Sequence, residues 1–313
     1  MNHPATWLTG SIADLPTPFD SSDDIDIAAF EELCERQIAA GATAVVVAET
    51  AGEASTLTLA EHDAVVRAAV RTARGRARVI AGAGANATRH AIELTRLAEA
   101  AGADAVLSVV PYYNKPMQAG LVAHFAAVAD CTELPIILHD VPSRTARGLT
   151  DDTVVRLAAS SQFLGLRDGS GDVTRPLRLK SRLRPEFRLL SGDDPTVLAF
   201  LVHGGDGCMS QLAAVAPELL HELVASCLHG RLQTARDIAG RLAPLSAALA
   251  AETPAALKYA LSLSAWSSPR VRLPMVELAE ARQQEVARAV AGLADEARLR
   301  SGHRRLRFET GRP

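Results

Sequence analysis

Residues 163–172 read FLGLRDGSGD: an apolar run from Phe163 to Leu166, then Arg167, then a glycine-rich turn. Strands that are nearly all apolar are typical of a parallel sheet covered by helices. Similar apolar runs recur along the chain. We therefore predict eight strands, at Ser11–Leu15, Ala44–Val47, Val79–Ala81, Ala105–Val110, Pro135–His139, Phe163–Leu166, Arg188–Leu190 and Gly207–Met209.

Segments with helical periodicity separate the predicted strands, at Ile27–Ala40, Ala60–Ala73, His90–Ala101 and Leu121–Asp130. Thr58 and Glu61 have the spacing of a capping box, which predicts that a helix begins there. Eight strand–helix units joined by right-handed crossovers predict an α/β fold, the TIM (β/α)8 barrel. A doubly wound open sheet shows the same alternation and stays open as the alternative.

After Met209 the pattern changes to helix after helix, which predicts a C-terminal helical appendage at Pro217–Cys227, Leu232–Ala250, Pro254–Ser264 and Met275–Gly292. We divide the chain into a barrel at 1–230, a helical region at 231–295 and an arginine-rich tail at 296–313. We expect the tail to be flexible. Contact of the tail with a neighbouring subunit or an acidic partner is the alternative.

The composition narrows the classes of partner. Hydrophobic residues make up 48% of the chain, the mean hydropathy is +0.08 and the net charge is −3, so we expect no binding to nucleic acid or membranes. The four cysteines lack C-x-x-C spacing, which indicates reduced thiols in a cytoplasmic protein and no metal site. No signal peptide or membrane span is visible in the sequence.

In a TIM barrel the chemistry gathers at the carboxyl ends of the strands, so the residues that follow each predicted strand form the candidate site. After the second strand, Gly52 can bring backbone N–H groups close to an anion, and the Thr50 hydroxyl can donate to a carboxylate. The segments at the other strand ends are Gly82–Asn86, Pro111–Asn114, His139–Arg144, Arg167, Ser191–Asp194 and, entering the eighth strand, Gly204–Gly207.

Together and in this order, these segments resemble the dihydrodipicolinate synthase and N-acetylneuraminate lyase family of pyruvate-type aldolases, over about residues 8–292. The most distinctive pieces are Gly82–Thr88, Pro111–Asn114, Val141–Arg144, Leu190–Asp194 and Arg272–Met275. The resemblance implies a TIM barrel and a lyase that acts on pyruvate or a related small 2-oxo acid. It also implies a homodimer or homotetramer. No motif implies a metal or an organic cofactor, so we expect none.

The resemblance assigns substrate-binding roles to five residues. Thr50, with the backbone of Ala51 and Gly52, is expected to bind the carboxylate of a pyruvate-like ligand. Met209, at the end of the eighth predicted strand, is a further expected substrate contact. Arg144 resembles the arginine that holds the carboxylate of the second substrate at the mouth of the barrel.

Two adjacent tyrosines complete the matches to the family. Tyr113 is expected to supply a phenol near the reacting carbon, and Tyr112 resembles a tyrosine that reaches toward the site of a neighbouring subunit. Packing of both rings at the barrel rim is the alternative interpretation.

Three innermost positions depart from the family pattern. Ala51 stands where the family has a second threonine, His139 where it has a tyrosine, and Arg167 where it has the lysine that forms a Schiff base with pyruvate. His139 can transfer protons because imidazole titrates near neutral pH, and a hydrogen-bonded core histidine is the alternative. We take Tyr113, His139 and Arg167 as the candidate catalytic residues.

Arg167 is expected to bind rather than attack. A Schiff base needs a neutral amine, and neutralising a guanidinium at pH 7 costs about 7.5–9 kcal/mol. A buried guanidinium needs a partner, and the candidates are Glu53, Asp168, Asp140 or the ligand. Lys115 is the lysine closest to the predicted mouth and a weak candidate for a replacement amine, whereas Lys180 and Lys258 are expected to be structural.

Three functional hypotheses follow. The first is a lyase that works without a covalent imine, with Arg167 stabilising negative charge on a bound 2-oxo acid and His139 or Tyr113 transferring the proton. The second is a catalytically silent paralogue that binds a small carboxylate as a sensor or an assembly partner. The third is a conventional synthase, in which the Schiff-base position is not residue 167.

Overall fold

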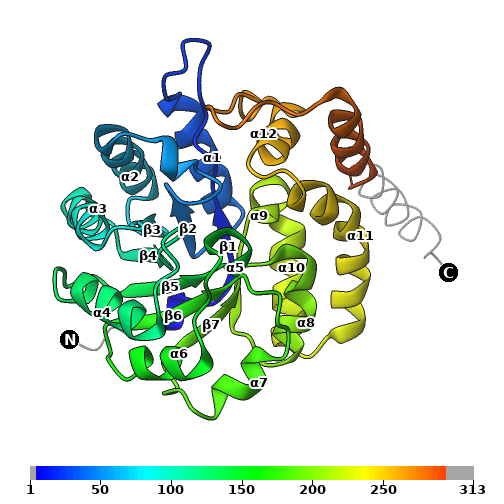
Figure 1. Cartoon of the computed structure of the whole chain (residues 1–313). Helices are drawn as coiled ribbons and strands as arrows, with labels where there is room; N and C mark the ends of the chain where they lie inside the picture. Colours follow the sequence, from blue (N-terminus) through cyan, green and yellow to red (C-terminus); the bar gives the residue numbers. More distant parts are fainter. Residues whose placement is uncertain (1–4, 294–313) are drawn as a thin grey trace.

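The computed structural model describes residues 5–293 and is a closed barrel of eight parallel strands (Figure 1). The strands follow one another around the barrel in chain order, and the last pairs with the first, which confirms the TIM barrel and excludes the open sheet. The strands are β1 (Gly10–Asp14), β2 (Ala44–Val47), β3 (Arg78–Gly82), β4 (Ala105–Val109), β5 (Ile136–Asp140), β6 (Phe163–Asp168), β7 (Arg188–Ser191) and β8 (Gly207–Ser210).

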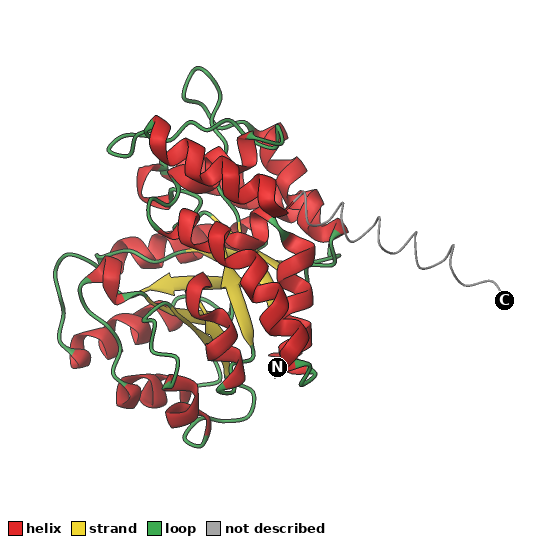
Figure 2. Ribbon diagram, turned by 90° about the vertical axis from the view of Figure 1, so that its right-hand side faces the viewer, coloured by secondary structure: helices red, strands yellow, loops and turns green. Residues whose placement is uncertain are grey.

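Helices cover the outside of the barrel, and Figure 2 shows the strands enclosed between them. The helices up to residue 228 are α1 (Ile27–Ala39), α2 (Leu59–Ala73), α3 (Thr88–Ala101), α4 (Gln118–Ala129), α5 (Pro142–Thr145), α6 (Asp151–Ala158), α7 (Arg175–Lys180), α8 (Val197–Val202), α9 (Leu212–Val215) and α10 (Pro217–Leu228), and of these the short α5 lies over the centre of the barrel (Figure 1). Short 3-10 turns are η1 (Ala5–Trp7), η2 (Ala54–Thr56) and η3 (Asp194–Thr196). The predicted capping box is confirmed, since Thr58 and Glu61 exchange hydrogen bonds at the start of α2.

The C-terminal helices pack beside the barrel and are α11 (Leu232–Ala250), α12 (Ala255–Ser262) and a last helix at residues 280–293 (Figure 1). The prediction that this last helix begins at Met275 is wrong. The segment before it is held at the barrel rim, where the Arg272 backbone N–H donates to Glu53. Residues 275–279 of this segment are therefore not helical, although their apolar residues fit a helical period. The arginine-rich tail at 296–313 lies outside the described residues. No helix within residues 5–293 is both long and apolar enough to cross a bilayer.

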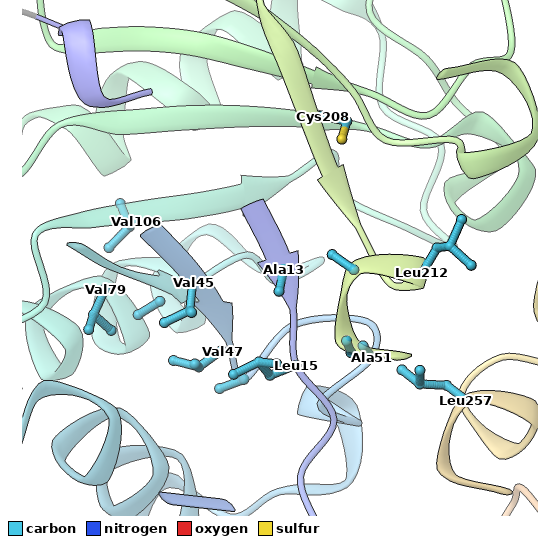
Figure 3. Close-up of a cluster of buried hydrophobic side chains, with 14 of the residues drawn as sticks. Ala13, Leu15, Val45, Val47, Ala51, Val79, Val106, Cys208, Leu212 and Leu257 are labelled. Atoms are coloured by element: carbon cyan, nitrogen blue, oxygen red, sulfur yellow. The ribbon is translucent and has the colours of Figure 1, made fainter. Parts of the chain in front are cut away.

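Two apolar clusters hold the barrel together. Residues such as Ile12, Val46 and Ile80 fill the inside of the barrel, and the alternate strand residues pack outward against the helices. Figure 3 shows part of the outer cluster, including Val45 and Val79. Burial of each such side chain stabilises the fold by about 1.5–3 kcal/mol. This rigid frame fixes the direction of the side chains at the strand ends.

An irregularity on β6 sets the direction of Arg167. The pairing of β5 with β6 slips by one residue, since Ile136 lies opposite Phe163 and Ile137 lies opposite Gly165. The extra residue, Leu164, belongs to the inner cluster, and Arg167 also faces the inside of the barrel, although the two are three positions apart. Without this bulge, strict alternation would turn one of the two outward.

Candidate active site

A cavity of about 390 Å³ opens at the carboxyl ends of β2 to β5, where the barrel fold places active sites. Of the predicted site residues, three line it: Thr50, Tyr112 and Arg144. Glu49 also lines it, on the side that adjoins the centre of the barrel. The pocket therefore brings a hydroxyl, a phenol, a guanidinium and a carboxylate together.

Arg167 lies below this pocket and is almost fully buried. Its guanidinium contacts Asp14 at 2.8 Å and Glu49 at 3.3 Å. A Cβ at position 192 would lie 2.9 Å from the Arg167 side chain, so Gly192 leaves the room that the arginine needs. Burial lowers the pKa of Arg167, but the attraction of Asp14 and Glu49 is larger, so the pKa of the guanidinium is raised above its ordinary value.

The three predicted protein partners of Arg167 are wrong, because other cations bind them. Asp140 and Asp168 face away from the barrel centre and share the guanidinium of Arg175, at 2.8 and 3.2 Å. Glu53 forms a buried ion pair with Lys258. The actual partners come from β1 and from the segment after β2.

The Glu49 carboxylate joins Thr50, His139 and Arg167 into one buried polar network. It accepts hydrogen bonds from the backbone N–H of Thr50 and from the Arg167 guanidinium, and it binds Nδ1 of His139 at 2.8 Å. Burial raises the pKa of Glu49, but His139 and Arg167 outweigh it and hold that pKa well below its ordinary value. The preceding residue, Ala48, has a left-handed backbone with a φ of 50°, a strained conformation for a residue with a side chain.

His139 lies level with Arg167 on the neighbouring strand and is buried. Burial is the main cause that lowers its pKa, against the attraction of Glu49, so the imidazole is neutral at pH 7. In that form Nδ1–H donates to Glu49. Nε2 then carries the lone pair of the neutral ring.

Asp14, on β1, is the second carboxylate that contacts Arg167. It is fully buried, and burial raises its pKa to about 7, with Arg167 opposing and Glu49 and Asp194 adding to the rise. Its oxygen lies 2.8 Å from the Arg167 guanidinium but outside good hydrogen-bond geometry, so both oxygens lack a hydrogen-bond donor within the described residues. Of the two carboxylates that contact Arg167, Asp14 is therefore the one that takes up a proton near neutral pH.

Four further predicted residues do not line the pocket of the single chain: Ala51, Gly52, Tyr113 and Met209. Tyr113 is 90% exposed and points away, while Tyr112, predicted to reach toward a neighbour, lines this chain's own pocket. Met209 is buried in the inner cluster below, not in the pocket. Ala51 is buried, and the Gly52 carbonyl accepts from Thr17 at 2.8 Å. Arg144 is exposed, and its nearest partner is the Thr253 carbonyl at 3.5 Å.

Sequence reasoning did not single out Asp14, Glu49 or Asp194. One signal was present for Asp14: a carboxylate interrupts the apolar first strand, two residues after Ile12, and so faces the same side. Glu49 begins the loop that holds Thr50, but its sequence gives no sign that the side chain turns back to Arg167. Asp194 accepts a hydrogen bond from the Leu212 backbone N–H at 3.0 Å, and its attraction helps to raise the pKa of Arg167.

None of the three lysines lies in the pocket or the barrel centre. Lys115 is exposed in the loop after β4, and Lys180 pairs with Asp206 at the end of α7. Lys258 is fully buried in α12 behind Glu53. Among residues 5–293, no cluster of three or more histidine, cysteine or acidic side chains is arranged to hold a metal ion.

A model described as the dihydrodipicolinate synthetase family matches residues 7–293. A protein of Acidiphilium cryptum (strain JF-5) named 4-hydroxy-tetrahydrodipicolinate synthase is 46% identical over 285 residues, which are 91% of this chain and 98% of that protein. A protein of the same name from Hyphomonas neptunium (strain ATCC 15444) is also 46% identical, over 289 residues, with 91% and 98% covered.

Solved structures agree with these matches. Dihydrodipicolinate synthase from Aquifex aeolicus has a TM-score of 0.88 and 36% identity, and the match covers 90% of this chain and 97% of that one. The chloride-inhibited dihydrodipicolinate synthase from Acinetobacter baumannii, solved in complex with pyruvate, has a TM-score of 0.89 and 39% identity, with 91% and 99% covered.

Proposed function

The chain belongs to the dihydrodipicolinate synthetase family, and from that premise we propose that it is a lyase acting on pyruvate or a related small 2-oxo acid without a lysine Schiff base. One observation carries the proposal: the His139 imidazole is bonded through Nδ1 to Glu49, which Arg167 and the Thr50 backbone hold in place at the pocket. No lysine is among the residues that line the pocket.

The pair of Glu49 and His139 has the geometry of an acid–base dyad. A carboxylate that accepts from Nδ1–H fixes the tautomer of the ring, leaves the Nε2 lone pair free to take a proton, and stabilises the imidazolium that forms. The proton comes from the carbon next to the carbonyl of the bound 2-oxo acid. The enolate that results gains stabilisation from the imidazolium that forms beside it.

Exchange of the methyl protons of pyruvate in D2O tests this proposal without knowledge of a second substrate. We expect the protein to accelerate exchange, measured by proton NMR, above the rate in buffer. His139→Asn should lower the rate by about 10²–10⁴-fold. The exposed His221 on α10 offers a matched control, and His221→Asn should exchange at the wild-type rate. Exchange that survives in His139→Asn would assign the proton transfer to another group.

Trapping with borohydride separates this chemistry from that of an imine. With pyruvate present, reduction should leave the mass of the protein unchanged, because Arg167 stays protonated. A stable adduct on Lys115, Lys180 or Lys258 would restore the conventional mechanism and refute the proposal.

A silent paralogue that binds a small carboxylate is the second candidate. The observation that favours it is that every donor around Glu49 is already used by the chain itself. In that case pyruvate would raise the melting temperature of the protein, while methyl exchange would stay at the rate in buffer.

A further inference from the structure

Three donors converge on one carboxylate at the floor of the pocket. They are the Thr50 backbone N–H, Nδ1–H of His139 and the Arg167 guanidinium, and the carboxylate that they hold is the chain's own Glu49. A backbone N–H, an imidazole N–H and a guanidinium are groups that proteins use to bind carboxylate ligands. We propose that Glu49 is a built-in anion that fills the anion-binding position, so that Arg144 at the mouth holds the substrate carboxylate.

The charges around the floor support this orientation. A ligand carboxylate placed there would meet Glu49 and, behind it, Asp14, and like charges repel strongly where water is excluded. Arg167 cannot offset a further anion, because it already faces both carboxylates. The floor therefore accepts a neutral part of the ligand and rejects a carboxylate.

The mouth offers the opposite environment. Arg144 is the only lysine or arginine among the residues that line the described pocket. It is exposed, and its one hydrogen bond within residues 5–293, to the Thr253 carbonyl at 3.5 Å, leaves most of its five donors for a ligand. A guanidinium with free donors binds a carboxylate through two parallel hydrogen bonds.

The orientation selects a class of substrate and rests on the proposed function. With its carboxylate at Arg144, a short 2-oxo acid directs its carbonyl and methyl carbon toward Glu49 and His139, where the proton transfer is proposed. A 2-oxo acid with a second carboxylate at its far end would place that charge on Glu49. The site is therefore specific for monocarboxylates, and pyruvate should bind at least tenfold more tightly than 2-oxosuccinate.

Removing the built-in anion tests the inference directly. In Glu49→Ala the three donors lose their carboxylate, so formate should bind in its place and raise the melting temperature as its concentration rises. Wild type and the control Glu222→Ala, a change at an exposed position of α10, should not respond to formate. If Glu49→Ala is folded by circular dichroism and its melting temperature does not respond to formate, the built-in anion is overturned.

Arg144 provides a second test that does not depend on the folding of Glu49→Ala. Its side chain is exposed, so Arg144→Met should fold like wild type. Its affinity for pyruvate, measured by calorimetry, should fall at least tenfold. In a folded Glu49→Ala background the same change should cost less, because the carboxylate can then turn to the floor. Unchanged pyruvate affinity in Arg144→Met overturns the inference.

These tests separate this inference from the proposed function, since neither measures turnover. A formate response in Glu49→Ala, together with an absence of methyl exchange in wild type, would refute the lyase and leave the built-in anion standing. Methyl exchange in wild type, together with no loss of pyruvate affinity in Arg144→Met, would support the lyase and refute the inference about Glu49 and Arg144.

Discussion

A single carboxylate, Asp14, should make the stability of the protein depend on pH. Its pKa is about 7 in the folded chain, against an ordinary value of 3.8 for an aspartate in water. The folded state therefore holds an extra proton between these values, and the stabilisation from Asp14 is complete at low pH and lost as the pH rises through 7. Asp14→Asn should remove this dependence.

Wild type and Asp14→Asn must be compared with each other, because the buried histidines are present in both and change the stability with pH in the opposite direction to Asp14. His62, His124 and His139 have lowered pKa values and favour the folded state as the pH rises. From pH 5 to 7, Asp14→Asn should gain stability relative to wild type, at up to about 1.4 kcal/mol per pH unit in urea unfolding. Parallel pH profiles for both proteins would contradict a raised pKa at Asp14.

The identity of residue 167 alone should not restore an imine. In Arg167→Lys the new amine would lie between Asp14 and Glu49, and two carboxylates hold an amine in its protonated, unreactive form. Adding Glu49→Gln removes one of these charges, and the pKa of the lysine should fall. We expect borohydride to trap pyruvate on the double variant at least tenfold faster than on Arg167→Lys, measured by mass spectrometry.

An equal rate in the two variants would mean that the carboxylates do not control the amine. No adduct in either variant, with both folded, would show that residue 167 is not placed for imine formation.

The sequence located this residue but not its partners. Arg167 follows an apolar run, and strand ends in a barrel converge, so its place in the centre could be predicted. Which carboxylate reaches it depends on side-chain direction and on competition in three dimensions. Glu53 and Asp140 were reasonable candidates, but Lys258 and Arg175 bind them from elements distant in the sequence.

At the scale of elements, α12 should depend on one buried ion pair. Lys258 is fully buried, binds Glu53, donates to the Arg270 carbonyl at 2.8 Å and lies 3.9 Å from the centre of the Phe19 ring. Lys258→Met would leave Glu53 as an uncompensated buried charge. We expect a loss of about 3–5 kcal/mol in the free energy of unfolding.

Lys180 is the matched control, because it also pairs with a carboxylate but at the surface. Its side chain is 39% exposed beside Asp206, so Lys180→Met should cost less than about 1 kcal/mol in the same urea experiment. Similar losses in the two variants would mean that burial does not set the strength of the Lys258 pair.

The elements themselves were largely predictable, and the exceptions have local causes. The eight strands and their order along the chain could be predicted, because short apolar runs alternate with segments of helical periodicity and each pattern shows which faces of an element are buried. The bulge at Leu164 could not be predicted, since one extra residue leaves an apolar run unchanged. The late start of the last helix, at residue 280, follows from the contact of Arg272 with Glu53, which no periodicity reveals.

At the scale of the whole molecule, large apolar side chains lie exposed around the pocket. Tyr113 and Met117, between β4 and α4, are 90% and 79% exposed, and Leu273 and Val276 on the rim segment are 78% and 68% exposed. Their neighbours Tyr112 and Met275 line the pocket, so both segments flank its opening. Tyr113 is also held in a left-handed backbone, with a φ of 72°, that projects its ring outward.

Exposed apolar side chains of this size mark a surface for association, so we expect a homodimer or homotetramer in light scattering coupled to gel filtration. Tyr113→Lys with Met117→Lys should lower the molar mass at micromolar concentration, since burial of two charges opposes assembly. Leu177→Lys is the control, because Leu177 is 60% exposed on α7, away from the pocket opening. A monomeric wild type, or a double variant that assembles like wild type, would show that this rim does not bind a second copy.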